Sequence, residues 1–344
     1  MGLKQVMVMA GLGLHAFTAV SGELRLYTWE AYFSQQLLDD FKKETGHTVH
    51  QVYFENETLR DDVVYSGKAA SYDLFVIDGY ALKTLANGGI IAPLPDALSS
   101  TLNRFSSNAK AACGDYGVPY AQGSIGIGYR ESEVKGAFNS WMDLFHYIQD
   151  NPNKAVIPNH GIDTVAIALM ALGYHPMSAE QSELEEAFLL LRSSVKNLLA
   201  YRNTFGYVME KQEQSEMVVS VFYSGEKESI SLYTKQDDWK YVIPKEGTLN
   251  WFECLATHAN RPMNDATIAF LAFINEPKNA IANAEQFWFA TANQEALSLA
   301  STAYLNDREL FPLETNQAMK YYYQYLDADT RAVRNNMVRI LVEE

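Results

Sequence analysis

Aromatic and acidic side chains occur together where several predicted strands end. Trp29 and Tyr32 follow the first strand, and Asp78 and Tyr80 follow the next buried one. Open α/β sheets bind ligands in the loops at the carboxyl ends of their parallel strands. We therefore expect these side chains to converge on one site with others that follow or lie on later strands, namely His160, Asp163, Tyr223, Trp251 and Glu253.

This pairing of rings with carboxylates suits a linear alkyl amine that carries several charges. Its ammonium groups need charge-assisted hydrogen bonds to carboxylates. Its methylenes need apolar walls, and aromatic faces also attract ammonium groups by cation–π contacts worth about 0.5–2 kcal/mol each. A carboxylate that is desolvated without a partner is penalised. The spacing of the carboxylates should therefore match the length of the ligand.

Each of these side chains also has an ordinary structural explanation. Trp29 and Trp251 could be core aromatics. Tyr80 could pack beside a helix, and Asp78 or Asp163 could cap a helix N-terminus, which is a common role for Asp at a strand-to-helix turn. Only the recurrence of the pattern at several strand ends favours a ligand site.

Catalytic and metal-binding alternatives have fewer residues to support them. The chain has no glycine-rich phosphate loop and no nucleophile elbow, and its seven histidines are scattered. We expect a protein that is not an enzyme and that has no cofactor and no metal. The run Tyr321–Tyr323 keeps a ferric-ion site open, because adjacent tyrosines offer oxygen ligands. The alternative for this run is a helix that displays aromatic side chains.

The elements that must position these residues follow an α/β alternation. A buried parallel strand is indicated by the almost wholly apolar segment 73–77, and a loop is expected at 78–80. Gly46 should end the first helix, since glycine readily adopts the left-handed conformation there. We expect strands at 24–27, 48–54, 73–77, 116–129, 154–158, 218–222 and 250–257, and helices at 34–44, up to 86, at 164–172 and at 179–199, with a mostly helical remainder.

Two long strands are predicted to cross between lobes. The glycines spaced through 116–129 relax the backbone, which suits a crossing strand, and 250–257 is the second candidate. A chain of 344 residues is also too long for one typical domain. We expect two α/β lobes with a cleft between them, an N-terminal lobe made of 23–121 and 253–298 and a C-terminal lobe made of 122–252 and 299–344.

The N-terminus and the charge indicate an exported protein. Lys4, the short apolar run Val6–Ala16 and the small residues up to Gly22 predict a signal peptide at 1–22, with an uncleaved anchor as the alternative. No later segment has the length and apolarity of a membrane span, so the protein should not be embedded in the membrane. The formal net charge of −15 argues against nucleic acid as a partner and against docking on anionic lipid.

The chain has two cysteines, Cys113 and Cys254. Both fall near the predicted crossings, and they could form a disulfide in an oxidising compartment. Two small buried thiols are an equally good explanation. No spacing in the chain resembles that of a structural zinc site.

Over nearly all of the mature chain, the sequence resembles the periplasmic spermidine/putrescine-binding proteins. The pieces Trp29-x-x-Tyr32 and Trp251-x-Glu253 are the more specific part of this resemblance. The matching segments include Leu-Tyr-Thr-Trp-Glu-Ala-Tyr at 26–32, Phe-Lys-Lys-Glu-Thr-Gly at 41–46, Tyr-Asp-Leu-Phe-Val at 72–76, Val-Pro-Tyr-Ala-Gln-Gly at 118–123, Ser-Trp-Met-Asp-Leu-Phe at 140–145 and Lys-Glu-Gly-Thr-Leu-Asn-Trp-Phe-Glu at 245–253. The resemblance implies a periplasmic location and a two-lobed periplasmic binding protein fold of type II.

The resemblance also implies roles for individual residues. Glu253 stands where the family has an Asp that meets an internal amine, and Asp163 stands at an acidic position that meets a terminal amine. The family's C-terminal contact falls near Tyr323 or Gln324, and Tyr322 is adjacent. The rings expected to line the ligand are Trp29, Tyr32, Tyr80, Tyr223 and Trp251.

Two departures from the family bear on the choice of ligand. His160 stands where the family has an Asp, and Asp78 stands where it has a small hydroxyl residue. Asp78, Asp163 and Glu253 together could match three amines, so we expect a triamine such as norspermidine or spermidine rather than putrescine. If His160 faces an ammonium group, its protonation near neutral pH should weaken binding between pH 8 and pH 6.

The resemblance further implies an inner-membrane partner for the closed, ligand-bound protein, which we expect to be a monomer. In transport this partner is an ABC permease. In the related norspermidine-sensing proteins of vibrios it is a receptor that makes and degrades cyclic di-GMP and so controls biofilm. The two departures, together with a tyrosine-rich tail after Pro312, favour signalling over transport.

Overall fold

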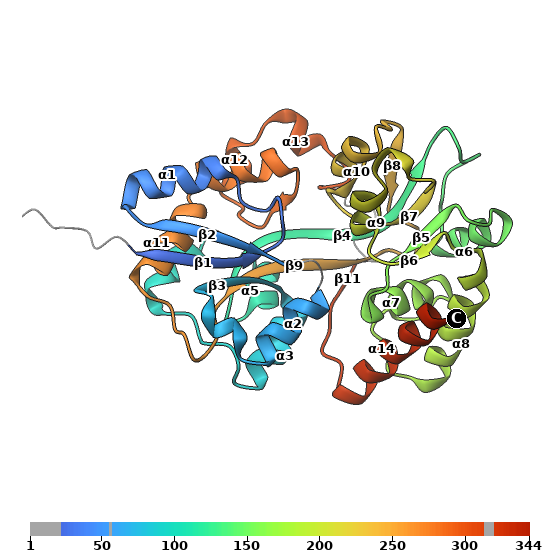
Figure 1. The fold of residues 1–344 in the computed structure, drawn as a ribbon, viewed down its shortest axis with the longest axis horizontal. Helices are drawn as coiled ribbons and strands as arrows, with labels where there is room; N and C mark the ends of the chain where they lie inside the picture. The colour runs from blue at the N-terminus through green and yellow to red at the C-terminus, as the bar shows by residue number, and fades with distance from the viewer. Residues whose placement is uncertain (1–21, 55–56, 313–319) are drawn as a thin grey trace, which may run out of the picture.

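A computed structural model describes residues 22–54, 57–312 and 320–344 (Figure 1). The predicted signal peptide lies almost wholly outside these residues. The strands are β1 Glu23–Thr28, β2 Thr48–Tyr53, β3 Leu74–Asp78, β4 Val118–Arg130, β5 Ala155–Ile157, β6 Ala200–Tyr201, β7 Val219–Tyr223, β8 Trp239–Val242, β9 Thr248–Ala256, β10 Ala290–Thr291 and β11 Lys320–Tyr322.

Fourteen α-helices surround these strands in the described part of the chain. They are α1 Gln35–Thr45, α2 Glu57–Tyr65, α3 Gly79–Asn87, α4 Ser99–Leu102, α5 Ser107–Cys113, α6 Trp141–Asp150, α7 Gly161–Ala171, α8 Gln181–Ser194, α9 Thr204–Lys211, α10 Glu226–Thr234, α11 Asp265–Ile274, α12 Pro277–Phe287, α13 Thr302–Asn306 and α14 Ala328–Glu343.

Two long strands tie the molecule together. The strand order is β2-β1-β3-β9-β4-β7-β5-β6, with β8 and β10 paired to β4 and β11 paired to β9. Strands β4 and β9 run antiparallel from Val118 opposite Leu255 to Ser124 opposite Asn250, and they extend through both halves of the molecule (Figure 1). The prediction of a two-lobed α/β fold with two crossing strands is confirmed.

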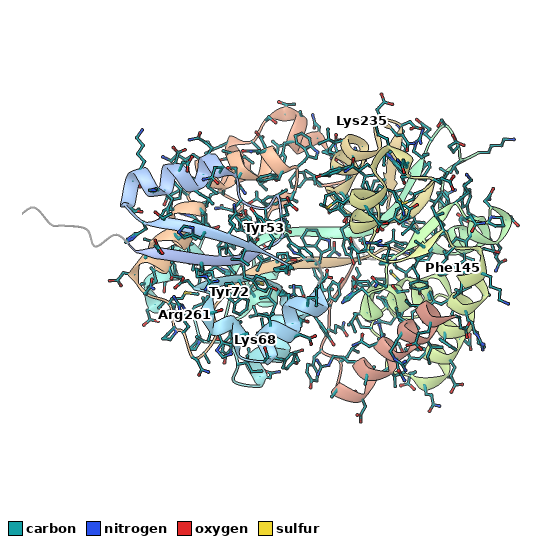
Figure 2. All side chains as sticks on the ribbon, viewed as in Figure 1. Tyr53, Lys68, Tyr72, Phe145, Lys235 and Arg261 are labelled. Atoms are coloured by element: carbon teal, nitrogen blue, oxygen red, sulfur yellow. A yellow bond between two sulfur atoms is a disulfide. The ribbon has the colours of Figure 1, made fainter. Side chains whose placement is uncertain are left out.

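Buried apolar side chains form separate cores in the two halves. The first core packs β1, β3 and the C-terminal part of β9 against α1, α3 and α11. The second packs β5, β7 and the C-terminal part of β4 against α6, α7 and α14, and a small third core lies beside it. Tyr72 packs against the first core and Phe145 lies in the second, in the left and right halves of Figure 2.

The exact lobe boundaries remain a prediction. Tyr304 and Leu310, which the predicted boundaries assign to the C-terminal lobe, pack in the first core. The last helix, α14, packs on α7 in the second half. We therefore propose that the chain leaves the first lobe after Leu310 and not at residue 298.

A capping serine, a terminal glycine and an amphipathic pattern account for the first helix, as the sequence predicts. The Ser34 side chain accepts a hydrogen bond from the Leu37 backbone N–H, and this caps α1. Gly46 has a φ of 79° and ends the helix in the left-handed conformation, where glycine avoids the steric cost of a Cβ. Leu37, Leu38 and Phe41 of α1 are buried, as the amphipathic pattern of this segment requires.

Three local predictions were wrong. No loop occupies 78–80, because α3 begins at Gly79 directly after β3. The predicted helix 164–172 begins earlier, at Gly161, so that Asp163 lies in its first turn. The tyrosine run is a strand and not a helix, because β11 pairs in parallel with β9, Tyr321 lying opposite Leu249.

The glycines of β4 leave space for neighbouring side chains. A Cβ at Gly123 would lie 2.2 Å from Cζ2 of Trp251 and 2.3 Å from Oγ of Ser224, distances that no real Cβ contact tolerates. A Cβ at Gly126 would meet the Tyr241 ring in the same way. These glycines therefore allow close side-chain packing against β4. This role adds to the backbone freedom expected from the sequence.

Cys113 and Cys254 form a disulfide, which resolves the alternative that the sequence leaves open. The bond joins the last residue of α5 to β9, and its Cα atoms are 5.8 Å apart. Cys254 directly follows Glu253 on β9. The disulfide therefore anchors the strand that carries one of the predicted site residues.

Candidate ligand-binding site

The predicted site residues come from both halves of the molecule. Trp29, Tyr32, Asp78 and Tyr80 follow β1 or lie at the junction of β3 and α3, in the first half. His160, Asp163, Tyr223 and Tyr323 follow or end elements of the second half. Trp251 packs against both cores, and Glu253 lies two residues further along the crossing strand β9.

Three predicted residues of the second half surround the carboxylate of a fourth, Asp163. Asp163 is 2 % exposed. Its Oδ1 accepts a hydrogen bond of 2.6 Å from the Tyr323 hydroxyl, and its Oδ2 accepts one of 2.5 Å from the Tyr223 hydroxyl. His160 Nδ1 lies 3.0 Å from the same Oδ2. The structure thus brings His160, Asp163, Tyr223 and Tyr323 together, whereas Gln324 is exposed.

The electrostatics of this group contradict the predicted titration of His160 near neutral pH. Burial alone would lower the pKa of His160, but the charge of Asp163 and its hydrogen bond outweigh burial and raise this pKa to about 10. Burial likewise opposes the charge of Asp163, yet His160 and the two tyrosine hydroxyls lower its pKa. His160 is therefore a cation paired with Asp163 throughout the neutral range.

The second carboxylate, Glu253, is buried in the first half. Glu253 is only 8 % exposed, and its Oε1 accepts a hydrogen bond of 3.2 Å from Trp29 Nε1. Its Oε2 has no hydrogen-bond partner among the described residues. Burial raises the pKa of Glu253 to about 8, against the opposing charge of Arg60. Glu253 therefore offers one unused, desolvated acceptor.

Asp78 already has partners, and one of them is a residue that sequence reasoning missed. Its Oδ1 accepts a 2.7 Å hydrogen bond from the Ala81 backbone N–H, so Asp78 is the N-cap of α3. Its Oδ2 accepts a 2.6 Å hydrogen bond from Nη2 of Arg60. Arg60 is fully buried on α2, a helix that the sequence analysis did not predict. The capping explanation for Asp78 is confirmed.

The predicted aromatic residues lie in the first half, between the two halves and on the crossing strand β9. Trp29 lies against Phe54, with ring centroids 4.3 Å apart, in the first half. Tyr80 approaches Tyr323 at 6.2 Å and joins the halves. Trp251 donates through Nε1 to the Ser124 carbonyl at 3.3 Å. These positions are consistent with rings that flank the two carboxylates.

A strained turn holds Trp29 and Tyr32 in place. Ala31 between them has a φ of 59°, which costs a residue with a Cβ roughly 1 kcal/mol or more. The Tyr32 carbonyl accepts hydrogen bonds from the Tyr120 hydroxyl at 2.7 Å and from the Asn283 side chain at 2.8 Å. These buried hydrogen bonds compensate for the backbone strain. They hold the turn that carries the Trp29 and Tyr32 rings.

Two further acidic residues influence the site. Glu226 accepts a 2.9 Å hydrogen bond from the Tyr223 backbone N–H, and burial raises its pKa to about 8. The charge of Glu57 also helps to raise the pKa of Glu253 and of His160, although burial and nearer charges have larger effects. Glu57 therefore acts electrostatically on both halves. Each begins a helix a few residues after a strand ends, Glu57 after β2 and Glu226 after β7. Both therefore fit the strand-end pattern, but the sequence analysis did not include them.

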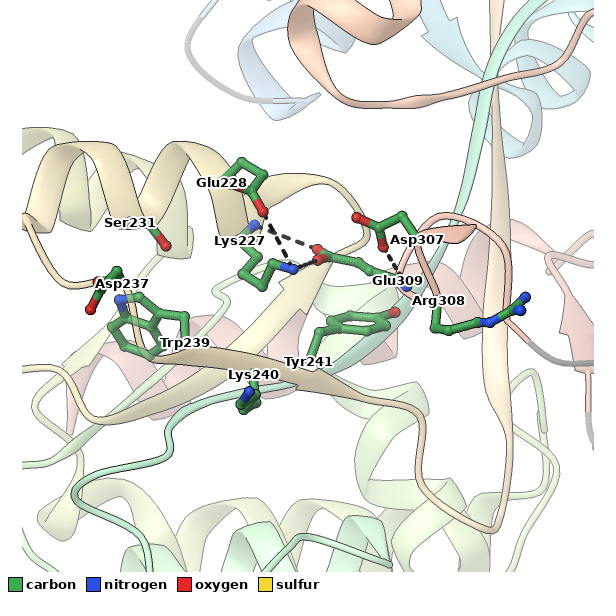
Figure 3. Close-up of a pocket in the computed structure, with 10 residues that line it drawn as sticks. All are labelled: Lys227, Glu228, Ser231, Asp237, Trp239, Lys240, Tyr241, Asp307, Arg308 and Glu309. Atoms are coloured by element: carbon green, nitrogen blue, oxygen red, sulfur yellow. Dashed lines mark hydrogen bonds and ion pairs between the residues drawn. The ribbon is translucent and has the colours of Figure 1, made fainter. Parts of the chain in front are cut away.

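Two surface cavities lie apart from these residues. One, of about 390 Å³, lies between α10, β8 and the segment 307–309, where Lys227 reaches towards Glu228 and Glu309 (Figure 3). The other, of about 380 Å³, lies beside α1 and β2. Neither is lined by a predicted site residue. The described residues contain no group of three or more His, Cys, Asp or Glu arranged to hold a metal.

This fold, in which two α/β halves are joined by crossing strands, is that of a bacterial binding protein. The chain belongs to the bacterial extracellular solute-binding proteins, because the model of that family matches residues 36–312.

Individual relatives resemble the chain along most of its length. It is 23 % identical over 338 residues to the norspermidine sensor of Vibrio cholerae, covering 98 % of this chain and 93 % of the sensor. It is 27 % identical to a putrescine-binding periplasmic protein of Pseudomonas aeruginosa over 334 residues, with 90 % and 89 % covered. The spermidine/putrescine-binding periplasmic protein of Escherichia coli is 27 % identical over 302 residues, with 84 % and 83 % covered.

Solved structures share the fold at low sequence identity. A putative spermidine/putrescine ABC transporter protein of Listeria monocytogenes superimposes with a TM-score of 0.82 at 22 % identity, covering 93 % of this chain and 99 % of that one. A Treponema pallidum lipoprotein gives a TM-score of 0.79 at 17 % identity, with 94 % and 100 % covered. The fold prediction is confirmed.

The expected periplasmic location is also confirmed, since several of these relatives are periplasmic proteins. Within the described residues, no helix combines the length and apolarity needed to cross a membrane.

Proposed function

We propose that this protein binds a linear polyamine, a triamine such as norspermidine or spermidine, between its two lobes. The observation that carries the proposal is the pair of buried carboxylates, Asp163 in the second half and Glu253 in the first, each beside tyrosine or tryptophan side chains. A ligand with ammonium groups at separate points along an alkyl chain can meet both. The names of the relatives support the same ligand class.

In this proposal, the ligand supplies what the site lacks. Oε2 of Glu253 is buried and has no partner among the described residues, and an unpaired buried acceptor costs about 1–3 kcal/mol. An ammonium group would satisfy it with a charge-assisted hydrogen bond. Trp29 and Trp251 would cover the methylenes. Asp163 would accept a hydrogen bond from the far end of the ligand while it keeps its His160 and tyrosine partners.

Isothermal titration calorimetry with the mature protein tests this function. Norspermidine and spermidine should bind, and putrescine should bind more weakly because it offers one amine fewer. Tighter binding of putrescine than of either triamine would contradict the triamine assignment. No binding of any polyamine would overturn the proposed function.

We further propose that an inner-membrane partner reads the ligand-bound form. The first relative named above is a sensor and matches nearly the whole chain, which favours action on a cyclic di-GMP receptor that controls biofilm. Delivery to an ABC permease is the second candidate, favoured by the transport-type relatives. Capture from solubilised membranes with the ligand present should recover a receptor with cyclic di-GMP domains. Recovery of permease subunits instead would assign the protein to transport.

The ferric-ion alternative has weaker support. The hydroxyl of Tyr322 accepts a hydrogen bond from Asn108 at 3.1 Å, whereas that of Tyr323 donates to Asp163. Adjacent hydroxyls therefore point to different partners and do not converge on one position. A thermal unfolding scan with ferric citrate should leave the melting temperature unchanged.

A further inference from the structure

A carboxylate of the first half contacts the second half at the start of α10. Glu309 lies in a segment that packs with the first half, because the adjacent Leu310 is buried in the first core. Its Oε1 accepts a hydrogen bond of 2.8 Å from the Gly225 backbone N–H and a longer one of 3.5 Å from that of Lys227. Helix α10 belongs to the second half, where its Ile230 lies in the third core. Glu309 therefore joins the two halves at the N-terminus of α10.

The position of Glu309 is fixed from both sides. Its backbone N–H donates to Oδ1 of Asp307 at 2.8 Å, and Oδ2 of Asp307 accepts from Trp288 Nε1 at 2.7 Å. On the other side, Lys227 Nζ lies 3.5 Å from Oε2 of Glu309 (Figure 3). The Glu309 side chain is only 2 % exposed, so these contacts are stronger than they would be in water. A carboxylate at a helix N-terminus also interacts favourably with the helix dipole.

The two halves approach each other closely at the same point. Gly225 has a φ of 98°, and a Cβ there would lie 2.6 Å from the Trp288 carbonyl oxygen of the first half. No strand pairing in the described part of the chain joins the segment 307–309 to α10. Hydrogen bonds and an ion pair hold Glu309 on α10, and these can break if the halves move apart.

The turn that Glu309 holds also carries a residue of the candidate site. Tyr223 ends β7, and its backbone N–H donates to Oε2 of Glu226 at 2.9 Å, which closes the turn before α10. The Tyr223 hydroxyl donates to Asp163. Glu309 binds the Gly225 N–H, two residues after Tyr223. If Glu309 moved away from α10, it would therefore release the turn that presents Tyr223 to Asp163.

We propose that Glu309 is an interlobe clasp, which holds the turn of Tyr223 in its ligand-binding position when the two lobes are closed. This inference rests on the proposed polyamine function and adds a positioning residue that does not touch the ligand. The clasp slows ligand release, because the lobes open only after the hydrogen bonds from α10 to Glu309 have broken. It also keeps part of the ligand-free protein closed.

Spin labels on the two lobes test the clasp, because the distance between them reports closure. Cysteines that replace the exposed residues Lys43 on α1 and Glu185 on α8 would carry the labels, since both native cysteines are in the disulfide. Double electron–electron resonance on the ligand-free protein should show a closed population that Glu309→Ala loses. If the wild type and Glu309→Ala have the same distribution of distances, the inference is overturned.

Stopped-flow kinetics with spermidine tests the effect on binding. Glu309→Ala should release spermidine at least tenfold faster than the wild type and leave the association rate unchanged, because interface changes act mostly on dissociation. Glu309→Gln should stay close to the wild-type rate, since its amide oxygen can still accept from Gly225. An unchanged dissociation rate in Glu309→Ala would overturn the inference, and polyamine binding would stand. If the wild type binds no polyamine, the proposed function fails, and the ligand-free distances still decide whether the clasp exists.

Asp73→Ala is the matched control. Asp73 is also a buried carboxylate that accepts from a backbone N–H, that of Arg25 at 2.8 Å, and pairs with a cation, Arg261 at 2.8 Å. All three residues lie beside or on strands of the first half. The control should lower the melting temperature without changing the interlobe distances or the release of spermidine. If it changes both as much as Glu309→Ala does, the effect is a general loss of stability, and the inference is overturned.

The folding of each variant is checked by circular dichroism. If Glu309→Ala does not fold, Glu309→Met/Lys227→Met replaces it, because this double variant keeps the side-chain volume and removes both charges. It should show the same loss of the closed population and the same faster release of spermidine. A folded double variant that closes like the wild type would overturn the role of Glu309.

Discussion

At the scale of residues, the site combines fixed charge pairs with one unused carboxylate oxygen. Asp163 is paired with His160 and two tyrosines, and Asp78 with Arg60. Glu253 alone of these carboxylates has an oxygen without a partner in the described structure. The residue types at strand ends predicted this set, but their partners follow from contacts that sequence spacing does not contain.

The first residue-scale prediction concerns His160. Because Asp163 raises the pKa of His160 to about 10, the imidazole should stay protonated between pH 6 and pH 8. Its contribution to stability is complete below the unfolded pKa of about 6.5 and is lost only as the pH rises through about 10. A two-dimensional NMR titration of the imidazole should show no midpoint below pH 8, with His160→Asn used to assign the signal. A midpoint near 6.5 would separate His160 from Asp163.

The second residue-scale prediction concerns the pH dependence of binding. Burial raises the pKa of Glu253 to about 8, so the carboxyl is mostly protonated at pH 6 and must lose its proton to pair with an ammonium group. Amine affinity should rise with pH, by up to about tenfold per unit below pH 8. Calorimetry in two buffers of different ionisation enthalpy should detect proton release on binding.

Glu253→Gln should flatten that pH profile. Glu226→Gln serves as the comparison, because burial raises the pKa of Glu226 to about 8 as well. If the pH slope persists in Glu253→Gln but vanishes in Glu226→Gln, the titrating carboxyl is that of Glu226, and the prediction for Glu253 is wrong.

At the scale of elements, the crossing strands position the site, and Gly123 makes their packing possible. A Cβ at Gly123 would overlap the Trp251 ring, and overpacking of this kind costs about 1–3 kcal/mol. Gly123→Ala should lower the free energy of unfolding by this amount in urea denaturation and weaken ligand binding by displacing Trp251. Gly206→Ala is the control, since a Cβ at Gly206 would meet no side-chain atom closer than 3.5 Å, an ordinary contact distance. If the two variants were equally stable, the Trp251 ring would have moved aside without a cost in stability, and this prediction would be wrong.

The elements also show what sequence reasoning can reach. Strands β4 and β9 were predictable because long β-rich runs mark both locally, with spaced glycines in β4. The tyrosine run of β11 was predicted wrongly, because its strand character comes from pairing with β9, some 70 residues earlier. Arg60 was missed for the same reason, since its partner Asp78 lies on another element. Long-range pairing overrides local propensity at such positions.

At the scale of the whole molecule, two strands join two cores, and one buried carboxylate lies on each side. The disulfide between Cys113 and Cys254 fixes β9 to the first half, so Glu253 should move with that lobe. The group around Asp163 belongs to the second half. In the proposed function, a ligand that contacts both carboxylates would couple the lobes, and the membrane partner would read the resulting shift in population.

The central claim is tested most directly by calorimetry on the two carboxylates together. Asp163→Asn and Glu253→Gln should each weaken binding of the tightest polyamine at least tenfold, because each removes a charge-assisted hydrogen bond worth about 1.5–3 kcal/mol. Both variants should keep the wild-type fold by circular dichroism. Wild-type affinity in both folded variants would contradict a site shared between the two lobes.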